Sequence, residues 1–117
     1  MSYALLIVEP VGQRATRSAA EGQALYDSML AFAAGLRERG ILREAQSLLA
    51  QDQAVRVQVR EGQSRLVDGP FAELKEMVGG FFLIDCETDA EALEIARACP
   101  AAQWCTVEVR KLGPCFM

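Results

Sequence analysis

Runs of apolar residues predict four main strands along the chain. Residues 3–8 and 81–86 are apolar at nearly every position, which is typical of strands in a sheet that is covered on both faces. Residues 41–50 predict a further strand, although Arg, Glu and Gln dilute their apolar content, and residues 104–110 alternate as a last strand. Of these, the strand at 81–86 is expected in the centre of the sheet.

A β-hairpin is expected in the middle of the chain. Valines alternate with polar residues over 55–60, Glu61-Gly62 offers a tight turn, and a second short run ends at Val67.

Two helices are predicted, each preceded by residues typical of a helix start. Ser18 with Glu21, and Thr88 with Glu91, have the spacing of a capping box. Gly40 is a typical residue just after the end of the first helix. The apolar stripe of that helix recurs at helical spacing and consists of Leu25, Met29, Phe32, Ala33 and Leu36. The second helix carries Leu93, Ala96 and Cys99 and ends at Pro100.

The predicted order is strand, helix, strand, hairpin, strand, helix, strand. Two strand–helix–strand halves predict an α+β, ferredoxin-like antiparallel sheet with both helices on one face and an inserted hairpin. Because the strands at 3–8 and 81–86 are apolar on both sides, the helix-free face would expose a large apolar patch. We therefore expect a homodimer in which two such faces pack together, leaving Glu108 and Arg110 near the rim or in a cleft between the sheets.

Composition narrows the class of protein. The 117 residues are expected to form a single domain, 1–117, and 51% hydrophobic with 24% charged residues is typical of a globular chain. A net charge of −4 without a basic stripe argues against nucleic acid as a partner. The longest apolar run, 4–8, is too short for a membrane span, so we expect a cytoplasmic protein without a membrane partner.

The cysteines and the absence of histidine exclude the usual metal sites. Cys86, Cys99, Cys105 and Cys115 include no C-x-x-C pair, and the chain has no histidine. Cys86, Cys99 and Cys105 are interpreted as small core residues in a reducing compartment, and Cys115 as an exposed thiol without a catalytic role. No metal and no organic cofactor is implied.

One segment contains a dense cluster of charged and turn-forming residues, of the kind found in functional sites. Residues 67–76 read Val-Asp-Gly-Pro-Phe-Ala-Glu-Leu-Lys-Glu, followed by a glycine-led strand, a helix and a terminal Val-Glu-Val-Arg at 107–110. Over nearly the whole chain this pattern resembles the YCII-related, or DGPF-domain, family. The resemblance implies a dimeric α+β barrel, a fold that includes small-molecule isomerases and monooxygenases.

The same resemblance indicates where a site is expected. For some relatives a histidine–aspartate active site has been suggested; without histidine, only the acidic half carries over, and Asp68 is the candidate catalytic residue. If Asp68 is desolvated in a cleft between sheets, its pKa rises and it can act as a general acid or base. Arg56 and Lys75 are then expected to hold an anionic ligand, and Phe71 and Glu73 complete the predicted ligand contacts.

Alternatives remain open at this point. Asp-Gly-Pro is also ordinary turn chemistry, in which Asp68 caps a short helix over 72–77 and Phe71 packs under the hairpin. The resemblance also implies a non-catalytic protein-interaction or regulatory accessory role linked to alternative sigma factors. A third alternative is a scaffold dimer without any ligand.

Overall fold

The computed structural model describes residues 1–116. In chain order the elements are β1 (Ser2–Pro10), α1 (Ala19–Glu38), β2 (Leu42–Ser47), β3 (Val55–Arg60), β4 (Gln63–Asp68), β5 (Glu76–Asp85), α2 (Asp89–Ala98) and β6 (Thr106–Lys111). Short 3₁₀ turns lie at Arg14–Thr16, Gln51–Gln53 and Pro100–Gln103. None of the helices within residues 1–116 is long and apolar enough to cross a membrane.

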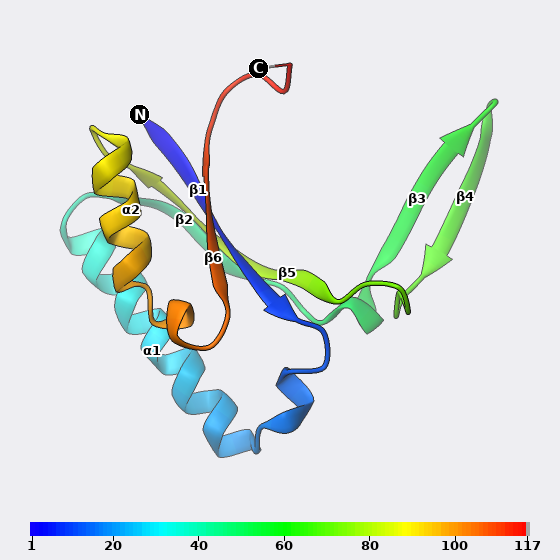
Figure 1. The fold of residues 1–117 in the computed structure, drawn as a ribbon, viewed down its shortest axis with the longest axis horizontal. Coiled ribbons are helices and arrows are strands. Elements are labelled where there is room, and N and C mark those ends of the chain that lie inside the picture. Colours follow the sequence, from blue (N-terminus) through cyan, green and yellow to red (C-terminus); the bar gives the residue numbers. More distant parts are fainter. Residues whose placement is uncertain (117) are drawn as a thin grey trace.

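Four strands form one antiparallel sheet in the order β2-β5-β1-β6. This order, with a helix after the first and the third of the four strands, is the ferredoxin-like α+β arrangement that the sequence predicts. Figure 1 shows α1 and α2 on the same side of this sheet. The expected central position of the strand at 81–86 is confirmed, because β5 lies between β2 and β1.

Alternation along the strands separates a covered from an uncovered face. In β1 the side chains of Tyr3, Leu5 and Ile7 are buried, whereas the intervening residues are half-buried. The buried set packs against α1 and α2, and Phe82 of β5 meets Phe32 of α1 edge to face with ring centroids 5.4 Å apart. Antiparallel partners share a face. The helix-free face therefore carries Ala4, Leu6, Val8, Val78, Phe81 and Leu83 on the two central strands, and Glu44, Gln46, Thr106, Glu108 and Arg110 on the two edge strands.

Both helix starts follow the sequence prediction. The Ser18 hydroxyl accepts a hydrogen bond from the Glu21 backbone N–H, and the Glu21 carboxylate accepts one from Ser18 N–H, which completes the capping box of α1. Thr88 caps α2 in the same way, but there the Glu91 carboxylate accepts from the backbone of Glu87. Both caps satisfy backbone donors that a helix leaves without partners.

The segment at 72–77 forms no helix, contrary to the prediction. Residues 71–74 make a turn in which Leu74 N–H donates to the Phe71 carbonyl, and β5 already begins at Glu76. Strand ends also differ: β2 stops at Ser47, and β6 starts at Thr106 because the preceding residues close a 3₁₀ turn.

The predicted hairpin forms a sheet of its own. Strands β3 and β4 pair with each other, from Val55 opposite Asp68 to Arg60 opposite Gln63, and not with the main sheet. Glu61 and Gly62 adopt positive φ at the turn, as a two-residue hairpin loop requires. In Figure 1 the hairpin rises from the end of the sheet, away from both helices.

A buried tyrosine ties the start of α2 to the sheet. The Tyr3 hydroxyl donates a hydrogen bond to the Asp89 carboxylate, and Lys111 Nζ lies 3.5 Å from the same carboxylate. The hydrogen bond between Tyr3 and Asp89 raises the pKa of Tyr3 to about 12. The same hydrogen bond, together with the charge of Lys111, lowers the pKa of Asp89. The contact links β1, α2 and β6.

Tyr3→Phe is expected to reduce stability in a pH-dependent way. The Asp89 contribution is present above the ordinary pKa of an aspartate and is lost as the pH falls through its lowered value. The Tyr3 contribution is present below the ordinary pKa of a tyrosine and is lost as the pH rises through about 12. Urea unfolding should therefore show the largest difference from wild type between about pH 5 and 9.

Tyr26→Phe, at an exposed tyrosine of α1, serves as the control and should follow the wild-type profile. A Tyr3→Phe profile parallel to wild type from acid to alkaline pH would show that the Tyr3–Asp89 bond contributes nothing to folding.

Candidate functional site

A cavity of about 500 Å³ lies between the amino-terminal half of α1 and the helix-covered face of the sheet. We refer to it as the α1–sheet cavity. Its walls are mainly apolar, and Leu25, Met29 and Ala33 of α1 face Ile7 and Phe82 of the sheet across it. Trp104 closes one side. The cavity exists because the amino-terminal half of α1 does not close onto the strands as its carboxyl-terminal half does, where Ala33 and Leu36 are buried.

A buried ion pair lies at the polar end of this cavity. Glu9, at the end of β1, is only 7% exposed, and Arg14 holds its carboxylate with two nitrogens. Nη2 lies 2.6 Å from Oε1, and Nε lies 3.0 Å from Oε2. This two-nitrogen geometry is the strong form of an arginine–carboxylate pair.

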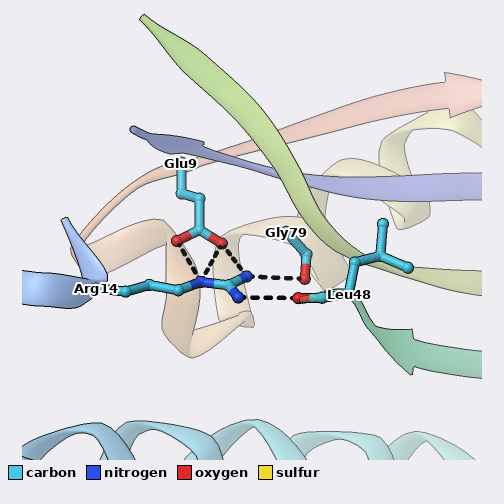
Figure 2. A network of polar contacts seen from close by, with 4 residues as sticks. All are labelled: Glu9, Arg14, Leu48 and Gly79. Carbon is cyan, nitrogen blue, oxygen red and sulfur yellow. Dashed lines mark hydrogen bonds and ion pairs between the residues drawn. The ribbon is translucent and has the colours of Figure 1, made fainter. Parts of the chain in front are cut away.

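The same guanidinium also reaches two other strands. Figure 2 shows Arg14 donating to the backbone carbonyl of Leu48, just after β2, and to that of Gly79 in β5, at 2.9 and 3.3 Å. Leu48 N–H donates in turn to the Gly79 carbonyl at 2.9 Å. One side chain therefore joins the ends of β1 and β2 to the middle of β5.

Gly79 makes room for this ion pair. The pairing of β1 with β5 shifts between Ile7 and Val8, which leaves Gly79 as an extra residue in β5. A Cβ atom at position 79 would collide with Glu9 Oε1 and lie 2.7 Å from Arg14 Nη2. Only glycine fits here, so the bulge and the buried ion pair depend on each other.

Arg17 lies beside the cavity and has no ion-pair partner among residues 1–116. It lines the α1–sheet cavity next to Ser18. Burial and the charge of Glu9 raise the pKa of the nearby Cys105 thiol, and Arg17 offsets only part of this, which lowers the fraction of reactive thiolate.

Three of the five predicted site residues lie together at the base of the hairpin. The Arg56 guanidinium lies 4.2 Å from the ring centroid of Phe71, which is buried, and Arg56 Nη1 lies 3.9 Å from Glu73 Oε1. Asp68 and Lys75 are exposed. Asp68 ends β4 opposite Val55, and Lys75 contributes its backbone carbonyl to Val11 N–H.

A second cavity, of about 520 Å³, lies beside Arg56 and Phe71. We call it the hinge groove, since it separates the hairpin from the main sheet and is lined by Leu48, Leu49, Ala54, Leu74 and Val78 in addition. Asp68 lines neither this groove nor the α1–sheet cavity.

The chain matches a known protein family over nearly its whole length. A model of the YCII-related domain matches residues 1–114, almost the whole chain. The chain belongs to the YCII-related family. This confirms the resemblance on the Asp-Gly-Pro-Phe segment.

A bacterial relative supports the assignment. The YCII-related chain is 33% identical over 97 residues to an uncharacterized protein of Rhizobium meliloti (strain 1021), a match that covers 83% of this chain and 78% of the relative. Membership of the family establishes the domain, and the uncharacterized relative adds no functional assignment to it.

The sequence prediction for the YCII-related chain did not include the buried ion pair of Glu9 and Arg14, or Gly79 beside it. One signal was available: Tyr3, Leu5 and Ile7 alternate on the covered face, and the same period places Glu9 there too. A carboxylate at a covered position requires a cation, and Arg14 is the first one after it.

Gly79→Ala is expected to lower the free energy of unfolding by about 2–4 kcal/mol, because the added methyl displaces Glu9 from Arg14 and leaves the carboxylate buried without its partner. Gly35→Ala, in α1 with open space around it, should instead raise it by about 0.5–1 kcal/mol. Urea denaturation of both variants measures the contrast, and a Gly79→Ala protein as stable as wild type would contradict the role of the bulge.

Proposed function

We propose that this YCII-related protein binds a small, largely apolar molecule with one anionic group in the α1–sheet cavity. The observation that carries the proposal is the cavity itself. At about 500 Å³ it falls in the size range of small-molecule sites, and apolar walls with a few convergent polar groups are typical of them.

The charges around the cavity favour one orientation of the ligand. Arg14 already donates hydrogen bonds to Glu9 and to two backbone carbonyls, so it has few donors left for a ligand. The Glu9 carboxylate disfavours a second anion close to it. Arg17 has no counter-ion within residues 1–116, so the anionic group of the ligand pairs with Arg17 and the apolar part extends along α1.

We further propose that the functional unit is a homodimer joined through the helix-free faces of two sheets. Those faces carry the half-buried Ala4, Leu6, Val8 and Leu83, and apolar patches of this kind mark association surfaces. A two-fold axis that lies between the two sheets, parallel to both, would bury both patches at once.

The acid–base role of Asp68 stays a prediction. Its carboxylate is exposed in the single chain, so the desolvation that this role requires has to come from a second subunit or a bound ligand. The alternative of an interaction module without a ligand also remains a prediction, and a ligand screen without any hit would favour it.

A thermal-shift screen of small carboxylic acids with apolar bodies tests the binding proposal. An acid present at about 100 times its dissociation constant adds about 2.7 kcal/mol of stability, which raises the melting temperature by several degrees. Arg17→Gln should weaken each hit about tenfold or more through the loss of a charged hydrogen bond. Gly22→Leu, whose side chain enters open space at the cavity wall, should abolish binding without loss of stability.

Matched controls separate this site from the others. Arg37→Gln removes the same charge from the far end of α1, and Gly35→Leu adds the same side chain there; both should bind like wild type. Hits that survive Gly22→Leu but are lost in Arg56→Gln or Asp68→Asn would place the ligand at the base of the hairpin and contradict the proposal.

Sedimentation equilibrium tests the dimer. Wild-type protein should be dimeric at micromolar concentration, and Leu83→Glu, which puts a charge on the helix-free face, should be monomeric. Leu93→Glu introduces the same change at a 46% exposed position of α2 and should stay dimeric. A monomeric wild-type protein, or a dimeric Leu83→Glu variant, would contradict the sheet-to-sheet interface.

A further inference from the structure

The β3–β4 hairpin has one apolar and one basic face. We call residues 55–68 the arm. Alternation and the pairing of Val57 with Leu66 place four apolar side chains on one face, together with Ser64 and, at the base of the hairpin, Asp68. The opposite face carries Arg56, Arg60 and Arg65, together with Val67. The apolar set is Val55, Val57, Val59 and Leu66, which are 55%, 62%, 59% and 67% exposed.

An arm of this kind needs cover from outside the single chain. A two-stranded hairpin is at best marginally stable in water unless its apolar face packs on something. Every residue of β3 and β4 is exposed, and the strands pair only with each other. The surface that holds the apolar face must therefore belong to another molecule.

The hinge groove lies between the helix-free face of the sheet and the base of the arm, where Arg56 of the basic face lines it. Val78 lies on the helix-free face opposite Val8 and also lines the hinge groove. Leu49, 77% exposed, and Ala54 continue the groove to the first residue of the arm. A molecule that covers the sheet is therefore in reach of the arm.

Charge favours a second copy of this chain as that molecule. The arm holds three arginines and two acidic residues, a net charge of +1, whereas the whole chain carries −4. The remainder of each copy is therefore at −5, and a basic arm is attracted to the acidic body of another copy.

The size of the sheet face points the same way. Four strands of six to ten residues present every second side chain, which is about fifteen residues on the helix-free face. Stable interfaces use about 20–30 residues on each side. The exposed residues of the arm can supply the interface residues that the sheet face lacks.

We propose that the arm packs its apolar face on a second copy of this chain, extending the sheet-to-sheet interface beyond the sheet. This inference rests on the proposed homodimer. In a two-fold dimer both arms make the contact, so each substitution in the arm acts twice.

Val57→Glu and Gln58→Glu test the arm. They are neighbours in β3 on opposite faces, both exposed in the single chain, so neither disturbs the core. Val57→Glu, and in the same way Leu66→Glu, should raise the dimer dissociation constant at least tenfold in sedimentation equilibrium, whereas Gln58→Glu should change it less than threefold. Hydrogen exchange of the arm amides should be slow in the wild-type dimer and fast in the Val57→Glu protein.

The outcomes separate the arm from the dimer itself. Wild-type dissociation constants for Val57→Glu and Leu66→Glu, with Leu83→Glu monomeric, would overturn the arm contact while the sheet interface stands. Fast exchange of arm amides in a wild-type dimer would overturn it as well and would leave the arm free for a different protein. A dimer unaffected by Leu83→Glu but dissociated by Val57→Glu would overturn the sheet interface and support the arm.

Discussion

The ion pair between Glu9 and Arg14 is the interaction on which the candidate site depends. It places a carboxylate on the covered face of the sheet, where an apolar residue would otherwise continue the core, and it holds the ends of β1 and β2 to the bulge of β5. Burying such a charge is unfavourable without a close partner, which explains why Arg14 holds the carboxylate with two nitrogens and why position 79 has no side chain.

This constraint also explains why a cavity lies beside it. Around the ion pair the sheet is lined by glycines and a carboxylate instead of large apolar side chains, so α1 has nothing to pack on there. The helix is held from its other half, where Ala33 and Leu36 are buried in the core. A space with apolar walls and a neutralised carboxylate at one end follows from these two facts. Arg17, which has no ion-pair partner within residues 1–116, lies beside it.

The sequence predicted the fold well because its signals are local and repeated. Alternation in 55–60, the capping residues Ser18 and Thr88, and two strands apolar on both sides were enough for the element order and the sheet. The site was harder to predict because it depends on contacts between distant residues. Arg56, Phe71 and Glu73 are brought together at the base of the hairpin, whereas Asp68 is exposed there. The sequence could not predict this exposure, because no pattern in it specifies the direction in which a hairpin leaves the sheet.

Methyl NMR of the protein with a bound carboxylic acid tests the central claim most directly. If the ligand enters the α1–sheet cavity, the methyl signals of Leu25, Met29 and Ala33 move on titration and those of Leu49 and Leu74 in the hinge groove do not. Shifts confined to the hinge groove, with the α1 methyls unchanged, would contradict the account.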